Sequence, residues 1–286
     1  MSQSYPNSPN IKNILDTLQI SEKHIHEYAD KFVPYLYLDG HRSSCIGDNE
    51  IDQYKSGFDF FLRFTAILKS LGFKQLVTMV HTLRNLQVTG RIDAIKEATQ
   101  ESVISKFHHL ENSNISFYGN LELYKEIGFN DFYNFLKSHS HNSNGNTFHH
   151  HILINYSEDW AIKNLNEFDK MPDIGSVIRF TKGHVSGGWI PLKMQGTTIV
   201  YSQIPSVSEF WSDDGILTLI LIAFGNWLKM KKYIGSKSYS TVEKEEIHNL
   251  RDNELLYRKI ELQLNVPRHN RIITYEPTGP IEYELK

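Results

Sequence analysis

The stretch 33–44, VPYLYLDGHRSS, joins an almost continuous apolar run to an acid, a glycine and two bases. Such a run predicts a strand over 33–38 that is covered on both faces, as strands of parallel sheets are. The polar residues then fall at the carboxyl end of that strand. Ligands of parallel α/β sheets bind at this edge, so the stretch predicts both a fold class and a binding site.

Strand-like apolar runs alternate with amphipathic helical segments along most of the chain. We expect strands at 33–38, 75–81, 115–118, 151–156, 176–180 and 198–202. Helices are expected at 11–30, 50–71, 91–110, 121–137, 157–169 and 216–228. This alternation predicts a single α/β domain with a mostly parallel, six-stranded sheet and helices on both faces.

The two ends of the chain differ in composition from this alternating region. Residues 1–10 are polar and are predicted to be disordered. The α/β domain is predicted to span 11–235. Residues 236–286 are charged and read as a peripheral extension with a short helix near 241–263.

The overall composition excludes several classes of protein. The chain has 286 residues, 40% of them hydrophobic, and a net charge of −3, so no general basic field predicts a nucleic-acid partner. Its single cysteine, Cys45, cannot form an intrachain disulfide and suits a reducing, cytoplasmic location. The longest apolar run, 216–228, is too short to span a bilayer, so no transmembrane segment is expected.

The residues after the first predicted strand have the chemistry of a diphosphate site. Gly40 lets the main chain approach a ligand, His41 offers a hydrogen bond, and the Arg42 guanidinium can bind two phosphate oxygens. Asp39 would repel a bare phosphate, which suggests that Mg²⁺ bridges the two. The same residues also fit a tight turn with an Asp–Arg pair on the surface, because Asp-Gly is common in turns.

Five short motifs resemble those of the cis-prenyltransferase family, which includes undecaprenyl diphosphate synthase, and they occur in the family's order. They are Asp39-Gly40-His41-Arg42-Ser43-Ser44, Gln53-Tyr54-Lys55-Ser56-Gly57, Val80-His81-Thr82-Leu83-Arg84-Asn85-Leu86, Asn155-Tyr156-Ser157-Glu158-Asp159-Trp160-Ala161-Ile162 and Ser176-Val177-Ile178-Arg179-Phe180-Thr181. The resemblance implies the fold of the cis-prenyltransferases, with an apolar pocket for the prenyl chain. It also implies that Asp39, Gly40 and Arg42 hold an allylic diphosphate, with Asp39 placing Mg²⁺.

The resemblance extends to other positions and fails at some. Thr82 and Asn85 keep a hydroxyl and an amide that the family uses in catalysis, and Arg179 keeps the first arginine of its second diphosphate site. A second arginine is missing there, and Lys182 and His184 are the candidate replacements.

Two further departures concern charged positions of the family. Arg84 stands where the family has a glutamate, which fits a phosphate contact and equally a surface ion pair. The late glutamate that helps to hold the metal in the family falls near Thr198, which has no carboxylate.

One branch of the family matches these departures better. Gly183-His184-Val185, followed by Pro191-Leu192, resembles the cyclolavandulyl and lavandulyl diphosphate synthases. The resemblance implies a homodimeric prenyltransferase that couples dimethylallyl, geranyl or farnesyl diphosphate, head-to-middle as in this branch, or cyclises it, with the help of Mg²⁺.

Two other functions fit parts of the sequence. One is a catalytically impaired partner subunit of a prenyltransferase complex, because the second arginine and the late carboxylate are missing. The other is a nucleotide-binding α/β protein, which ranks last since the chain has neither a Walker loop nor a G-x-G-x-x-G after a strand.

Two remaining clusters could hold a metal but have simpler interpretations. Of the run 149–151 (HHH), only His149 and His151 would share a face of a strand, and zinc sites usually take three or four ligands. A polar start to the strand is the simpler interpretation. Asp213 and Asp214 precede the helix over 216–228, where carboxylates suit the helix dipole.

Overall fold

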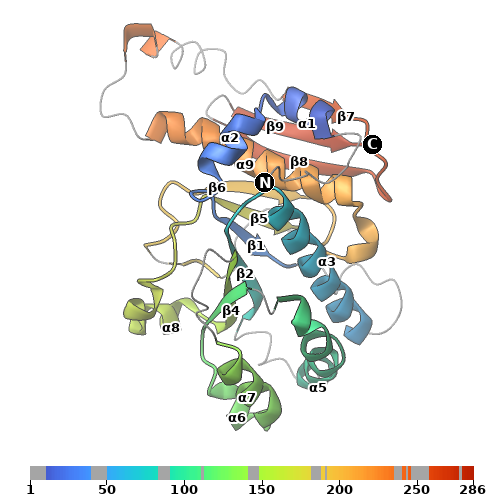
Figure 1. Cartoon of the computed structure of the whole chain (residues 1–286), viewed down its shortest axis with the longest axis vertical. Coiled ribbons are helices and arrows are strands. Elements are labelled where there is room, and N and C mark those ends of the chain that lie inside the picture. Colours follow the sequence, from blue (N-terminus) through green and yellow to red (C-terminus); the bar gives the residue numbers. More distant parts are fainter. Residues whose placement is uncertain are drawn as a thin grey trace.

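The computed structural model describes residues 11–39, 50–82, 91–110, 113–140, 148–181, 188–190, 192–234, 240–242, 244–245, 258–276 and 279–286. Within these ranges the strands form one sheet that crosses the molecule (Figure 1). Its strand order is β3-β4-β2-β1-β5-β6-β8-β9-β7. Six of the eight neighbouring pairs run parallel, and only β8 runs antiparallel to its neighbours β6 and β9.

The elements follow the expected alternation closely. The strands are β1 Pro34–Tyr37, β2 Gln75–Thr82, β3 Ser113–Tyr118, β4 Phe148–Tyr156, β5 Ser176–Phe180, β6 Thr198–Ser202, β7 Arg258–Leu262, β8 Asn270–Glu276 and β9 Gly279–Leu285. The α-helices are α1 Ile11–Leu18, α2 Glu22–Tyr28, α3 Glu50–Ser70, α5 Arg91–Ala98, α6 Leu123–Glu126, α7 Asn130–Ser138, α8 Glu158–Lys163 and α9 Asp213–Ile234. Short 3₁₀ segments are η3 Phe107–Leu110, η4 Leu165–Phe168 and η5 Ser208–Phe210, and the π-helix η2 spans Thr99–Ile104.

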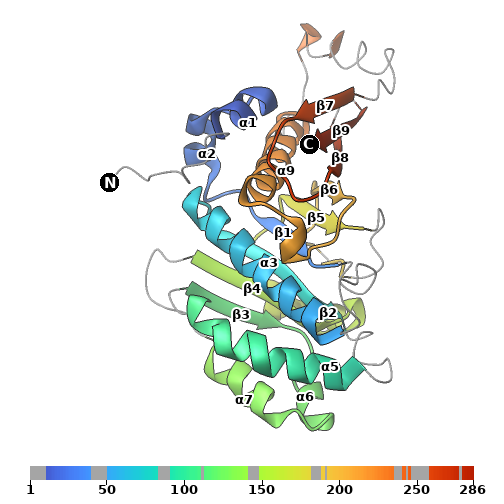
Figure 2. The same ribbon diagram turned by 90° about the vertical axis from the view of Figure 1, so that its right-hand side faces the viewer.

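Both faces of the sheet are covered, which is why β1 and β5 at its centre are buried along their whole length. On one face, Leu36 and Ile178 join the largest core cluster with side chains from α1, α3 and α9. On the other, Tyr35 and Val177 join a smaller cluster with residues from α8, η4 and the segment after β5. Figure 2 shows α3 lying between α9 and α5 on the first of these faces.

The sheet has nine strands, which corrects the predicted six. Residues 258–262 form strand β7, so the predicted helix near 241–263 is wrong there. The side chains of β9 show why the sequence did not predict these C-terminal strands. Ile281, Tyr283 and Leu285 enter the main core cluster. Glu284, on the opposite face, pairs with Lys259. The charged residues of β9 conceal this strand in a plain hydropathy scan, although Glu282 and Glu284 are buried along with their apolar neighbours.

None of the described helices is both long enough and apolar enough to cross a membrane. The longest of them, α9, is buried from Gly215 to Asn226, and most of these residues belong to the core cluster. The apolar run that the sequence shows at 216–228 is therefore core.

The histidine run lies inside β4, not at a polar start of the strand. His150 is fully buried and packs with its ring centre 5.7 Å from that of Phe61 and 4.7 Å from that of Phe148. Within the described residues, neither of its ring nitrogens has a hydrogen-bond partner. Burial lowers the pKa of His150 well below the ordinary value of a histidine. His150 is thus a core residue with unpaired polar atoms.

His149 and His151 face the other side of the sheet and stack at 4.0 Å. His149 bonds to Ser116, while the two ring nitrogens of His151 bond to Tyr118 and Gln75. No cluster of three or more metal-binding side chains occurs among the described residues. These two side chains therefore make hydrogen bonds that connect β4 to β2 and β3. Burial lowers the pKa of His151 to about 3.

Replacement of His150 by leucine should stabilise the protein and make it less sensitive to acid. Unfolded histidines titrate near 6.5, so the unfolded chain takes up protons below this pH that the folded chain resists, and stability is lost as pH falls. We expect His150→Leu to gain about 1 kcal/mol at pH 7. Below pH 6.5 it should lose about 1.4 kcal/mol less per pH unit than the parent. Denaturant unfolding between pH 7 and pH 5 measures both effects.

The matched control for this experiment is His109→Leu, since His109 is exposed on η3. This variant should keep the parent's dependence of stability on pH. If His150→Leu also kept it, the buried imidazole would not be the group that resists protonation.

Candidate functional site

The centre of the candidate site is an ion pair between Asp39 and Arg179. β1 and β5 are parallel neighbours with Tyr37 opposite Arg179, and Asp39 follows two residues later. Nη2 of Arg179 lies 3.2 Å from Oδ2 of Asp39. The Arg179 side chain is 2% exposed and that of Asp39 is 20% exposed. The pair therefore sits at the carboxyl edge of the sheet, and only its carboxylate reaches solvent.

The aromatic ring of Tyr37 supports the buried guanidinium. The central carbon of the Arg179 guanidinium lies 3.7 Å from the ring centre of Tyr37, which is a close cation–π contact. Burial raises the pKa of Tyr37, although the positive charge of Arg179 opposes this. The phenol is therefore neutral at physiological pH. A buried cation is costly unless it is paired, and Asp39 and Tyr37 both compensate for that cost.

Ser206, between β6 and η5, fixes the main chain of Asp39. The Asp39 N–H donates to the Ser206 hydroxyl oxygen at 3.0 Å, and that hydroxyl donates to the Asp39 carbonyl at 3.0 Å. The Ser206 N–H also donates to the same carbonyl at 3.2 Å. Three hydrogen bonds between two residues leave the Asp39 backbone little freedom to move.

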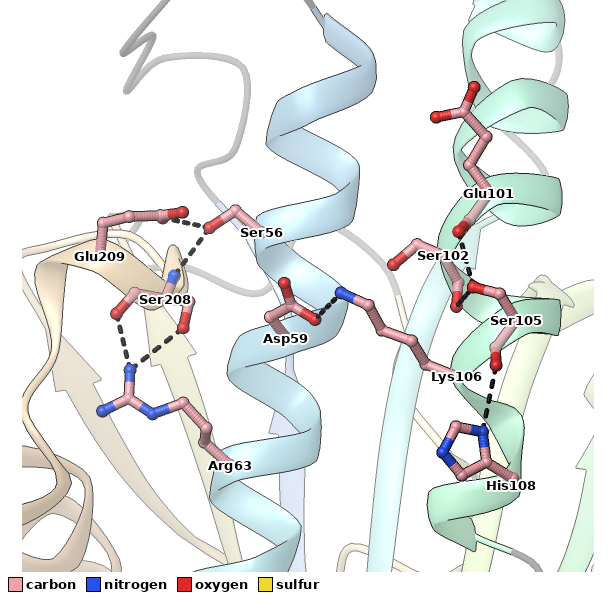
Figure 3. A network of polar contacts seen from close by, with 10 residues as sticks. All are labelled: Ser56, Asp59, Arg63, Glu101, Ser102, Ser105, Lys106, His108, Ser208 and Glu209. Atoms are coloured by element: carbon pink, nitrogen blue, oxygen red, sulfur yellow. Dashed lines mark hydrogen bonds and ion pairs between the residues drawn. The ribbon is translucent and has the colours of Figure 1, made fainter.

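The segment that carries Ser206 is in turn anchored to α3 (Figure 3). Ser56 accepts a hydrogen bond from the Ser208 N–H at 2.9 Å and donates to the carboxylate of Glu209. Arg63 donates to the Ser208 carbonyl at 2.8 Å and to its hydroxyl at 3.0 Å. These contacts connect α3 to the residues that position Asp39.

On its other side, α3 is held by the π-helix and the residues after it. Lys106 pairs with Asp59 at 2.6 Å, as Figure 3 also shows. Lys55 pairs with Glu101, which lies on η2. Both pairs are partly exposed, so each contributes little to stability and serves mainly to set the register of the two helices.

A second set of hydrogen bonds holds the segment 188–189 over the tyrosine face of the sheet. Tyr35 donates to the Gly188 carbonyl at 2.8 Å, and Tyr156 donates to the Trp189 carbonyl at 2.6 Å. The carboxylate of Glu158 accepts from the Trp189 N–H at 3.0 Å. Burial raises the pKa of both phenols, so they remain protonated donors. Residues of β1, β4 and α8 thus fix two consecutive peptide units.

Gly188 packs directly against the ring that supports Arg179. Its φ of +80° favours glycine, and a Cβ there would lie 2.6 Å from the Tyr37 ring and 2.8 Å from the end of Met79. The segment 188–189 and the Asp39–Arg179 pair therefore share Tyr37 as a common neighbour.

The motif over 155–162 forms the junction between β4 and α8. Asn155 has a φ of +49°, and its side-chain amide donates to the Asn120 carbonyl at 3.2 Å. Ser157 caps α8 by accepting a hydrogen bond from the Trp160 N–H at 3.2 Å. Tyr156 lies between Asn155 and Ser157, and Glu158 follows Ser157. The junction therefore places both side chains where they bind the main chain of Trp189.

The structure brings some of the predicted site residues together and does not describe others. Asp39 and Arg179 are paired, and Thr82 ends β2 at the same edge of the sheet. The remaining predicted residues lie outside the described residues: Gly40, His41, Arg42, Arg84, Asn85, Lys182 and His184. Thr198, where the family's late glutamate falls, starts β6 at the opposite edge, and its hydroxyl donates to the Gly175 carbonyl.

Sequence reasoning missed the residues that support the site. Tyr35 and Tyr37 alternate along the first strand, so a shared face was readable from their spacing. Tyr156 and Glu158 fall in a quoted motif, but nothing in the sequence pointed to Trp189. Ser206 lies in an ordinary loop and had no signal at all.

The described residues fit an open magnesium site. Mg²⁺ commonly takes one or two carboxylates from the protein and completes its coordination with phosphate oxygens and water. Asp39 offers one partly exposed carboxylate at the binding edge. A closed site built only of protein ligands is not found in the part of the chain that the structure describes.

Solved structures of prenyl diphosphate synthases resemble this fold. Lavandulyl diphosphate synthase from Lavandula x intermedia, in complex with dimethylallyl diphosphate, is 14% identical with a TM-score of 0.54, and the match covers 67% of this chain and 94% of that chain. A probable undecaprenyl diphosphate synthase from Campylobacter jejuni is 13% identical with a TM-score of 0.46, over 66% and 92% of the two chains. The sequence matches no family model and no curated protein.

The chain therefore has a cis-prenyltransferase-like fold, which confirms the resemblance that the five motifs predicted. The match spans nearly the whole of the lavandulyl enzyme but only two thirds of this chain. At this level of identity the likeness concerns the fold, and any activity has to be argued from the side chains at the edge of the sheet.

Replacement of Gly188 by alanine should disturb the site through Tyr37. The left-handed backbone costs an alanine about 1–2 kcal/mol, and the clash with Tyr37 adds to that cost. Gly128→Ala is the matched control, because Gly128 has a φ of +72° with no atom near the added Cβ. We expect Gly188→Ala to lose clearly more stability than Gly128→Ala in denaturant unfolding. Equal losses would mean that Gly188 does not pack against Tyr37.

Proposed function

We propose that this protein is a prenyltransferase that binds an allylic prenyl diphosphate at the carboxyl edge of its sheet and promotes release of the diphosphate. The observation that carries the proposal is the Asp39–Arg179 pair, which joins a partly exposed carboxylate, suited to holding a metal, to a buried positive charge. It lies where ligands bind in parallel α/β sheets. The likeness to a lavandulyl diphosphate synthase in complex with dimethylallyl diphosphate supports the same ligand class.

The chain's own residues have distinct roles in this proposal. The carboxylate of Asp39 would hold Mg²⁺, whose charge would stabilise the negative charge that develops on the departing diphosphate. Arg179, which is buried and paired with Asp39, is proposed to act on the same diphosphate through its positive charge, while Ser206 keeps Asp39 in place. Gly40, His41, Arg42, Arg84, Lys182 and His184 are proposed to bind the diphosphate groups, with Thr82 and Asn85 assisting catalysis.

We propose further that the reaction is an atypical one. The altered second diphosphate site favours irregular, head-to-middle coupling or cyclisation of dimethylallyl, geranyl or farnesyl diphosphate. A homodimer in the cytoplasm is proposed as the working form. The resemblance of Gly183-His184-Val185 and Pro191-Leu192 to the lavandulyl branch supports this choice of reaction.

Replacement of Asp39 by alanine tests the proposal. We expect release of diphosphate from dimethylallyl, geranyl or farnesyl diphosphate with Mg²⁺ to fall by about a hundredfold or more, as when one group that stabilises the developing charge is removed. Asp173→Ala is the control, since the side chain of Asp173 is 85% exposed and lies before β5, at the other edge. A parent that releases no diphosphate, or an Asp39→Ala variant as active as the parent, would contradict the proposal.

Asp39→Ala also leaves Arg179 buried without its carboxylate, which can cost about 3–5 kcal/mol of stability. Asp39→Asn therefore accompanies it, because the amide keeps the shape and can still accept a hydrogen bond from the guanidinium. Thermal unfolding of both variants separates lost folding from lost chemistry. A well-folded Asp39→Asn should remain impaired, since a neutral amide binds Mg²⁺ weakly.

A non-catalytic partner subunit is the alternative function, and one observation favours it. Thr198 lies at the opposite edge of the sheet from Asp39, so it replaces no carboxylate at this site. The alternative predicts that the isolated protein releases no diphosphate and that activity appears only when a complete prenyltransferase is added. Turnover by the purified protein alone would exclude this as its only role.

A further inference from the structure

Trp189 combines a fixed main chain with an exposed indole. Both its N–H and its carbonyl are hydrogen-bonded, to Glu158 and Tyr156 respectively. Its neighbours on either side, Gly188 and Ile190, are buried, yet Trp189 itself is 45% exposed. Tryptophan presents a large apolar surface with few rotatable bonds, so exposing it on a rigid backbone costs little ordering entropy when something binds to it.

The position of Trp189 connects it to the candidate site. Gly188, the preceding residue, packs on the ring of Tyr37, and the guanidinium of Arg179 lies on that same ring at 3.7 Å. The peptide that carries the indole is therefore only one aromatic ring away from the Asp39–Arg179 pair. The sheet edge thus brings together a charged site and an unburied aromatic surface held by β1, β4 and α8.

We propose that Trp189 contacts the hydrocarbon part of the substrate, and that it sets the preference for a prenylated diphosphate over inorganic diphosphate. This inference rests on the proposed function. A diphosphate satisfies the charged groups at the edge, but its prenyl chain needs an apolar surface next to them. Within the described residues, Trp189 is the large exposed aromatic residue tied to this edge, whereas Tyr275, which is 68% exposed, lies on β8.

The hydrogen bonds to the main chain explain how this contact can be selective. Tyr35, Tyr156 and Glu158 hold the peptide units while leaving the side chain unburied. Trp189 is in this sense a substrate-contacting residue, and the two tyrosines and Glu158 are positioning residues. None of the three needs to touch the substrate for the indole to be presented to it.

The test measures binding of two ligands in the presence of Mg²⁺. One is dimethylallyl thiolodiphosphate, whose sulfur link resists cleavage, and the other is inorganic diphosphate. Calorimetry gives the affinities, and tryptophan emission reports whether an indole is covered. The variants are Trp189→Ala and Trp189→Phe, with Tyr275→Ala as the control for loss of an exposed aromatic side chain elsewhere on the sheet.

We expect Trp189→Ala to weaken binding of the thiolodiphosphate by about tenfold or more, a change of 1.4 kcal/mol per tenfold step, while inorganic diphosphate binds as to the parent. Trp189→Phe should keep most of the affinity and lose the emission shift that the thiolodiphosphate produces in the parent. Tyr275→Ala should behave as the parent with both ligands. Thermal unfolding of each variant confirms that it is folded.

The outcomes separate this inference from the function on which it rests. If the parent binds both ligands and Trp189→Ala binds the thiolodiphosphate equally well, the inference is wrong and the proposed function stands. An emission shift that persists in Trp189→Phe also overturns it. If the emission of Trp189 changes only with protein concentration, the indole lies between two copies of the chain instead. Binding of neither ligand to the parent overturns both proposals.

Discussion

The guanidinium of Arg179, one residue before the end of β5, is buried to 2% exposure, and the rest of the site is arranged around the need to compensate its charge. A positive charge is costly to bury, so the neighbours of Arg179 must supply a negative charge and a polarisable surface. Asp39, two residues beyond β1, supplies the negative charge, and Tyr37, the last residue of that strand, supplies the aromatic surface. Parallel pairing of β1 and β5 puts all three at one edge, where the proposed function has the carboxylate hold the metal of an anionic ligand.

Two loops keep this arrangement rigid from opposite sides. Ser206 binds the main chain of Asp39, and its segment is anchored to α3 through Ser56 and Arg63. The segment 188–189 binds Tyr35, and Gly188 packs on Tyr37. A site that handles a charged leaving group benefits from groups fixed in advance, because they need no reorganisation during the reaction. The loops thus give the edge of the sheet its preorganisation.

The C-terminal strands show how the fold departs from a plain six-stranded sheet. β8 pairs antiparallel with β6, and β9 and β7 continue the sheet beyond it. Their apolar side chains extend the core under α9, while Glu284 pairs with Lys259 and Lys286 on the other face. The match to the lavandulyl enzyme covers two thirds of this chain, so the chain has structure in addition to what the two folds share.

Local sequence patterns encode the alternation of strands and helices in the parallel part and the placement of Asp39 and Arg179 near strand ends. Both follow from local periodicity, because a run of apolar residues reports burial without reference to its partners. The tertiary structure alone decided the contacts of Ser206, Tyr156 and Glu158, and the entry of the charged C-terminal residues into the sheet. Asp39 lies 140 residues from Arg179 and 167 from Ser206. Contacts across such separations depend on where the intervening chain returns, and no local pattern encodes that.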